Sequence, residues 1–134
     1  MFDIDQYEDA PTADITLKNP KTGAPLDITM TLAGPEHPVR KQLAFDTQRR
    51  LRANWQKTGK LQMQDPVEDE QDETDMLVAS TLGWSGIARR GQPLAFSAAA
   101  ARELYTDPQR RWLRTQVLAA LNEREAFIKR SETA

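Results

Sequence analysis

Residues 13–33 alternate between apolar and polar side chains on both sides of a segment, residues 19–25, that is dense in turn-forming residues. A period of two places the apolar side chains of an extended strand on one face, so the pattern predicts a β-hairpin over residues 13–33. The apolar face of its second strand consists of Leu26, Ile28, Met30 and Leu32. Because a lone hairpin is only marginally stable in water, this face must cover helices or pair with another chain.

A basic amphipathic helix is predicted over residues 36–58, after Gly34 and Pro35 end the second strand. Apolar side chains recur there at steps of three and four, which is typical of a helix with one narrow apolar stripe. The stripe includes Leu43, Leu51 and Trp55, and residues 36–60 carry seven basic against two acidic side chains. A helix this polar does not suit the centre of a core. We therefore expect it to pack along one edge, with Trp55 as its anchor.

Residues 65–75 contain seven acidic and no basic side chains, with Pro66 among them. This composition predicts an acidic linker over residues 64–75. The acids lack the spacing and the turn glycine of a calcium-binding loop, so no metal site is predicted. The last acids, Asp72 to Asp75, could also cap a following helix, because negative charge is favoured at a helix N-terminus.

The apolar pattern and the capping residues of residues 76–130 predict a helical core. The apolar run from Met76 is interpreted as a short buried helix closed by Gly83, and Ser97 is a good N-cap for an alanine-rich helix. Asp107 and Pro108 form a second helix start, for a last helix that reaches about Lys129. The predicted structural core residues are Trp84, Phe96, Trp112, Val117 and Leu121.

Taken together, these patterns predict an α+β fold, mostly α, in which the N-terminal hairpin precedes about four helices packed as a small helical domain. A chain of 134 residues suits a single domain. The composition of residues 1–12 and 130–134 indicates disordered ends.

The sequence offers little for catalysis. His37 is the only histidine and there is no cysteine, which excludes a Ser-His-acid triad around a second histidine and a thiolate zinc site. At a helix start, His37 is interpreted as an exposed or capping residue. Phosphate-binding and nucleophile-elbow motifs are also missing from the sequence. We therefore expect no catalytic residues, no metal, no cofactor and no enzymatic activity.

Membrane and nucleic-acid partners are also not favoured. No run approaches the roughly 18 apolar residues of a membrane helix, and the acidic N-terminus does not resemble a signal peptide. The basic helix and the cluster Arg110, Arg111 and Arg114 could meet phosphates, but the net charge is −2 and no DNA- or RNA-binding signature occurs. Ion pairing with the acidic segments is the better interpretation of these bases.

The order of motifs resembles the tail assembly chaperones of long-tailed, siphovirus-type bacteriophages. The similarity covers ITLKNPKTGAPLDITMTLAGPEHPVRK, then DMLVASTLGWSGI, then GQPLAFSAAAARELYTDPQRRWLRTQVLAALNEREAFI. In that family a strand, a turn, a strand and a Gly-Pro junction lead into a charged helix. Later, an apolar helix ending in Gly-Trp precedes a Pro-x-x-Phe-Ser helix start and a helix that carries Trp.

This resemblance implies a protein that coats the tape measure protein, helps to recruit tail tube subunits and is absent from the mature virion. It corresponds to the family's short form; a longer form, made by programmed frameshifting, binds the tube protein. It implies a homo-oligomer in the cytoplasm of the bacterial host. Candidates for partner binding or self-association are Leu26, Ile28, Met30, Leu32, Leu43, Leu51 and Trp55, with intramolecular packing as the alternative for each. Two alternative functions remain open: the protein is a small structural component of the virion, or it binds nucleic acid through its basic helix.

Overall fold

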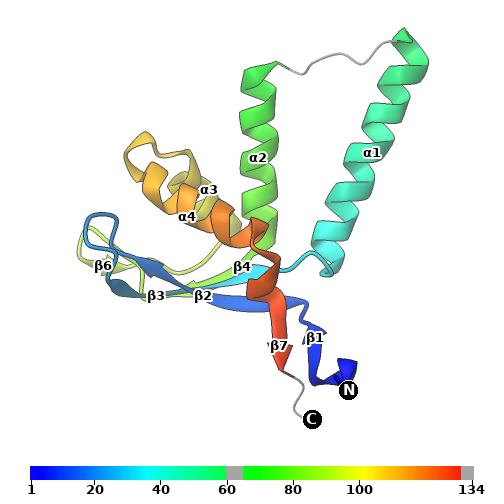
Figure 1. Ribbon diagram of the computed structural model, residues 1–134. Helices are drawn as coiled ribbons and strands as arrows, with labels where there is room; N and C mark the ends of the chain where they lie inside the picture. The colour runs from blue at the N-terminus through cyan, green and yellow to red at the C-terminus, as the bar shows by residue number, and fades with distance from the viewer. Residues whose placement is uncertain (60–64, 131–134) are drawn as a thin grey trace.

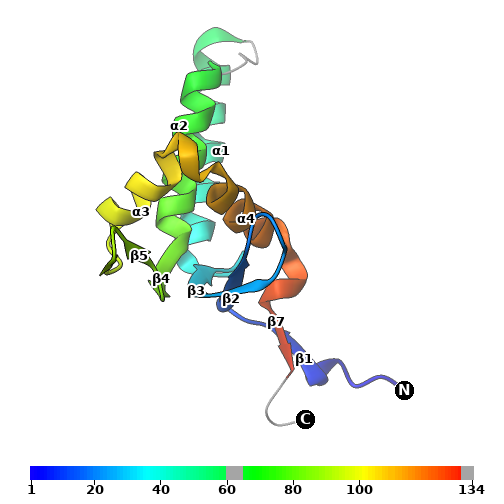
Figure 2. The same cartoon turned by 90° about the vertical axis from the view of Figure 1, so that its left-hand side faces the viewer.

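The computed structural model describes residues 1–59 and 65–130, and its fold confirms the predicted α+β class (Figure 1). Three strands form an antiparallel sheet in the order β2-β3-β4: β2 (Thr12–Lys18), β3 (Pro25–Ala33) and β4 (Thr81–Ser85). Helices lie over one face of this sheet (Figures 1 and 2). The protein therefore has a sheet layer and a helix layer, with the core between them.

Strands β2 and β3 confirm the hairpin predicted over residues 13–33, with Ile15 opposite Met30. The turn between them is stabilised by Asn19, whose side-chain oxygen accepts hydrogen bonds from the backbone N–H groups of Lys21 and Thr22 at 2.9 and 3.2 Å. Gly23 takes a φ of 75°, a left-handed conformation that glycine adopts without strain. The segment NPKTGAP therefore reverses the chain as its composition predicts.

Helix α1 (Pro38–Thr58) agrees with the helix predicted over residues 36–58. His37 caps it, because its Nδ1 accepts a hydrogen bond from the backbone N–H of Val39 at 3.1 Å. No residue of α1 is buried, and Trp55 is 52% exposed. The expectation that Trp55 anchors the helix is therefore wrong: α1 leans away from the body, so Trp55 has no core to enter (Figure 1).

The predicted acidic linker is wrong for the described residues, which from Pro66 onward belong to helix α2 (Pro66–Ser80); Gln64 lies outside them. Asp65 caps α2 by accepting a hydrogen bond from Val67 N–H at 2.8 Å, and Pro66 suits the first turn. Glu68 and Asp69 in that turn complement the helix dipole. Asp65, Glu68 and Asp69 therefore support the start of this helix, whereas the sequence pattern had suggested that role for Asp72 to Asp75.

Four acids of α2 form ion pairs with arginines of other helices, at 2.6–3.0 Å. The pairs are Arg50–Asp72 to α1, Arg102–Asp75 to α3 (Ala98–Thr106), and Arg111–Glu70 and Arg114–Glu73 to α4 (Arg111–Asn122). The expectation that bases pair with the acidic segments is confirmed for these residues. Together with the buried Leu77, these pairs connect α2 to the other helices.

The apolar run after Met76 ends in a strand, which corrects the helix predicted to close at Gly83. Helix α2 stops at Ser80, and β4 then pairs with β3, with Trp84 opposite Met30. Thr81 and Trp84 have high strand propensity, and β3 offers an open edge to pair with. A tight turn follows, in which a side chain on Gly86 would collide with the carbonyl oxygen of Asp27.

The C-terminal part departs from a single long helix. The Asp107-Pro108 start is confirmed, but it opens a short 3₁₀ turn, η2 (Pro108–Arg110), before α4. Helix α4 stops at Asn122, not near Lys129, and η3 (Arg124–Phe127) and β7 (Ile128–Arg130) follow. The physical reason is that Phe127 is buried in the core, so the chain must turn inward there.

Strand β7 pairs with β1 (Tyr7–Asp9), which follows η1 (Ile4–Gln6). The disordered N-terminus expected over residues 1–12 is therefore wrong for these elements. Disorder was also predicted for residues 130–134. Of these, only Arg130 is among the described residues, and it belongs to β7. A second small ribbon is formed by β5 (Ala88–Arg89) and β6 (Gln92–Pro93).

The core confirms two of the five predicted core residues as fully buried, Val117 and Leu121. Trp84, Phe96 and Trp112 are half-buried and pack against its edge. Trp84 and Phe96 meet edge to face at 5.0 Å between ring centroids, and Trp84 Nε1 donates a hydrogen bond to Leu94 O at 2.8 Å. The indole is therefore held by one polar and one aromatic contact rather than by complete burial.

Tyr105 links α3 to the sheet, and its ionisation should weaken the fold. Burial raises the pKa of Tyr105 to about 12, and its hydroxyl lies 2.6 Å from that of Thr81. An unfolded tyrosine loses its proton near pH 10, so the buried neutral hydroxyl of Tyr105 makes its full contribution to the free energy of unfolding below that pH. The free energy of unfolding should fall by about 3 kcal/mol between pH 10 and 12. Urea unfolding should show this loss, and Tyr105→Phe should remove the corresponding pH dependence; equal slopes for both proteins would contradict it.

Candidate protein-binding surface

The hairpin residues proposed as contact candidates are turned into the protein. Met30 and Leu32 have no exposed surface, and Leu26 and Ile28 are partly buried against the same core. The helix layer covers this face of the sheet, so intramolecular packing, the alternative interpretation, holds for all four residues. These side chains cannot form an exposed binding surface in this structure.

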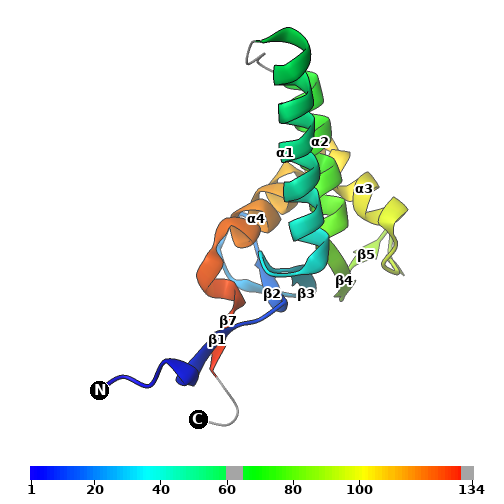
Figure 3. The ribbon, with the colours of Figure 1, turned by 90° about the vertical axis from the view of Figure 1, so that its right-hand side faces the viewer.

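The exposed surface is instead a two-helix arm formed by α1 and α2. Every residue from 44 to 59 and from 65 to 71 is exposed. In Figures 1 and 3 these parts of the two helices extend beyond the sheet, α3 and α4. We call α1 and α2 together the arm, and residues 44–59 and 65–71 its outer part. The arm presents helical surface that the remainder of the described chain does not cover.

The base of α1 is fixed to the body by Arg40. Its Nη1 donates hydrogen bonds to the carbonyl oxygens of Ala33 and Leu121 at 3.3 and 3.2 Å. The guanidinium also lies 6.0 Å from the ring centroid of Phe127, within cation–π range. Burial lowers the pKa of Arg40 from its ordinary value, without removing the charge at neutral pH. The arm is therefore anchored at its base and uncovered along its outer part.

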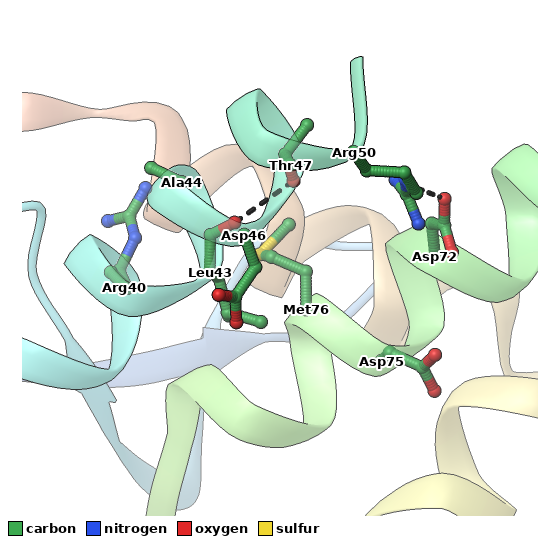
Figure 4. Close-up of a pocket in the computed structure, with 9 residues that line it drawn as sticks. All are labelled: Arg40, Leu43, Ala44, Asp46, Thr47, Arg50, Asp72, Asp75 and Met76. Atoms are coloured by element: carbon green, nitrogen blue, oxygen red, sulfur yellow. Dashed lines mark hydrogen bonds and ion pairs between the residues drawn. The ribbon is translucent and has the colours of Figure 1, made fainter. Parts of the chain in front are cut away.

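A groove of about 520 Å³ separates the two helices of the arm (Figure 4). Its apolar lining is contributed by Leu43 and Ala44 of α1 and by Met76 of α2. Charged side chains surround this strip, and one ion pair, Arg50–Asp72 at 3.0 Å, crosses from helix to helix. The remaining lining residues are Arg40, Asp46, Thr47 and Asp75. A narrow apolar strip between charged borders is the shape that an amphipathic helix can occupy.

The three candidate binding residues predicted on α1 therefore lie at two different places on the arm. Leu43 lines the groove, whereas Leu51 and Trp55 lie further along the arm and are 49% and 52% exposed. Two further exposed apolar side chains of the arm were not predicted from the sequence: Phe45, which is 51% exposed, and Val67 of α2, which is 64% exposed. Phe45 lies off the predicted stripe, and Val67 lay in the predicted linker. Recognition of Asp65-Pro66 as a helix start would have placed Val67 on a helix.

A second exposed apolar group lies on the ribbon of β1 and β7 and on the segment that precedes β1 (Figure 1). Phe2 stacks on Tyr7 with 6.3 Å between ring centroids, and Ile4 and Ile128 are also exposed. The ribbon is stabilised by an ion pair between Lys129 and Glu8 at 3.5 Å. It provides a natural control surface for experiments on the arm.

Within residues 1–59 and 65–130, no three His, Cys, Asp or Glu side chains are grouped so that they could hold a metal ion. In the same ranges, no helix combines the length and apolar character needed to cross a membrane. Comparisons with models of protein families, with curated proteins and with solved structures found no match to this chain.

Proposed function

We propose that this chain is a non-catalytic tail assembly chaperone of a long-tailed bacteriophage, the short form of its family. It binds and shields the tape measure protein and helps to recruit tail tube subunits. The observation that best supports this proposal is the arm, an exposed pair of helices with an apolar-lined groove and uncovered apolar side chains. The resemblance of the motifs in residues 15–41, 75–87 and 91–128 supplies the identity of the partner.

The arm suits a temporary complex with a long helical partner. An amphipathic helix can place its apolar side against Leu43, Ala44 and Met76 and its polar sides against the charged borders of the groove. Leu51 and Trp55 extend this contact along α1. Because these side chains are only half-exposed and dispersed, each contact is moderate and can be exchanged. Tail tube subunits can then displace the chaperone, which acts in the host cytoplasm and does not remain in the virion.

The test is co-expression with overlapping fragments of the tape measure protein, followed by co-purification. We expect at least one fragment to become soluble as a complex. Replacing Leu51 and Trp55 with alanine should weaken binding by at least about tenfold, since a buried aromatic anchor commonly contributes more than 1.4 kcal/mol. Isothermal titration calorimetry with the soluble fragment measures the change.

The matched control replaces Phe2 and Ile4 with alanine, which removes exposed apolar side chains from the other surface. It should leave the affinity unchanged. Failure of every fragment to form a complex, or an equal loss in the control, would contradict the proposal. Persistence of the protein in purified phage particles would instead identify a structural virion component.

A further inference from the structure

The two sides of the groove belong to helices of opposite charge. Helix α1 has six basic side chains and one acidic, whereas α2 has six acidic side chains and no basic one. We infer that the groove selects a helix whose two flanks carry opposite charge, acidic toward α1 and basic toward α2, and that it binds this helix in one direction. The inference rests on the proposed function, and it adds the charge pattern and the direction of the bound segment.

Arg50 and Asp72 are the charged side chains that face each other across the groove (Figure 4). The other charged residues of the lining have partners on their own helix or on the body: Arg40 with Ala33 and Leu121, Asp46 with Gln42 and Arg49, and Asp75 with Arg102. A helix that enters the groove therefore has to meet the charges of Arg50 and Asp72.

This ion pair makes the groove selective. Nη2 of Arg50 lies 3.0 Å from Oδ2 of Asp72. An α-helix with its side chains is about 10 Å wide, so it cannot lie between these two groups unless the pair separates. A helix with neutral flanks breaks the pair without replacing it. A helix with an acid on one flank and a base on the other replaces it with two ion pairs, one to each side of the groove.

The same arrangement of charge continues along the outer part of the arm. Lys57 follows Arg50 by seven residues, so both lie on one face of α1. On α2, Glu68 and Asp69 lie about one turn before Asp72, which places them on the same face as Asp72. All three of these outer residues are exposed. A helix that extends along the arm therefore meets basic side chains on one side and acidic side chains on the other.

Sides of opposite charge also determine the direction of the bound helix. Turning a helix end for end, with its apolar stripe kept on Leu43 and Met76, exchanges its two flanks. In one direction each flank meets opposite charge, whereas in the other direction each flank meets like charge, which is unfavourable. Copies of this protein that bind along one long helix with a constant flank pattern consequently all point the same way.

Three synthetic peptides test the charge pattern on the full chain. Each has about 20 residues, long enough to form a helix, with a leucine stripe and equal numbers of glutamates and lysines. The first peptide carries glutamates on one flank and lysines on the other, the second has these flanks exchanged, and the third mixes both residues on each flank. In isothermal titration calorimetry, the first two should bind equally and about three to ten times more tightly than the third, as a few exposed ion pairs allow.

Fluorescence quenching measures the direction of binding. Because the chain has no cysteine, a fluorophore can be attached specifically to Gln56→Cys, an exposed position near the end of α1. A nitroxide at the amino terminus of the peptide should quench this fluorophore for one of the first two peptides and not for the other. Equal quenching by both peptides would overturn the inferred direction.

Removing the charges of the ion pair, with Arg50→Gln and Asp72→Asn, should abolish most of the preference for separated flanks. The matched control, Arg111→Gln with Glu70→Gln, removes another exposed ion pair of α2 that lies outside the groove, and it should keep the preference. Equal affinity for all three peptides, or an equal loss of preference in the control, overturns the inference and leaves the proposed function standing. Failure of every peptide to bind also overturns it, whereas co-purification with tape measure fragments tests the proposed function separately.

Discussion

Replacement of both Ile28 and Met30 with aspartate is expected to unfold the protein. Met30 has no exposed surface and Ile28 is packed against the same core. The double change removes about 3–5 kcal/mol of apolar burial and places carboxylates where they can be neither hydrated nor paired. The sum approaches the whole stability of a small domain, which is about 5–15 kcal/mol. Far-ultraviolet circular dichroism and urea titration should show loss of the cooperative transition.

The control variant places aspartates at Leu51 and Trp55, the candidates that lie on the arm. Both side chains are about half-exposed, so the carboxylates remain in water. The free energy of unfolding should change by about 1 kcal/mol or less, since surface substitutions away from packed features have small effects. A folded Ile28→Asp, Met30→Asp protein, with a transition close to the original, would show that the inner face of the sheet is not part of the core.

The hairpin shows how far the sequence could predict the fold. Alternation alone predicted both strands and the face that carries the apolar side chains, because a period of two is a local property. The residues that cover that face are distant from the hairpin in the sequence. Leu77, Val117 and Phe127 complete the core from positions 45 or more residues further along the chain. The choice between self-association and intramolecular packing therefore required the structure.

Helix α2 shows where composition misled. Its high acid content is typical of a linker, but the acids are neutralised by Arg50, Arg102, Arg111 and Arg114 from three other helices. No pattern in the sequence joins these residues. The capping signal was nevertheless present, because Asp65-Pro66 repeats the Asp107-Pro108 pair that correctly predicted a helix start. The local cap therefore indicates a helix from Pro66 in place of the linker, and with it the length of the arm.

The end of α2 shows a different limit. The run that includes Leu77 and Leu82 is short and apolar, so its sequence alone suits a buried helix or a strand. The open edge of β3 decides in favour of a strand from Thr81 onward. Of the candidate binding residues, only those on α1 remain exposed or line the groove. Exposure depends on how α1 leans from the body, which helical periodicity does not specify.

The second large effect is expected at Arg114, the buried arginine at the centre of the helix layer. Arg114 is 4% exposed. Its guanidinium donates to Glu73 Oε1 at 2.9 and 3.1 Å, to Thr74 Oγ1 at 2.8 Å and to Tyr105 O at 3.1 Å. Arg114→Ala should cost about 3–5 kcal/mol, because the buried acceptors lose their donors and a cavity forms. Arg114→Lys should recover little, since one ammonium group cannot span acceptors that surround a planar guanidinium.

Arg111 provides the comparison that separates burial from charge. It lies on the same helix and pairs with Glu70 at 2.6 Å, but its side chain is 62% exposed. Arg111→Ala should therefore cost no more than about 1 kcal/mol, as exposed ion pairs generally do. Urea unfolding of both variants measures the difference. If the two losses were equal, the network around Arg114 would contribute only as a surface ion pair does, and the attachment of α2 to the body would have to depend on its apolar residues, Leu77 above all.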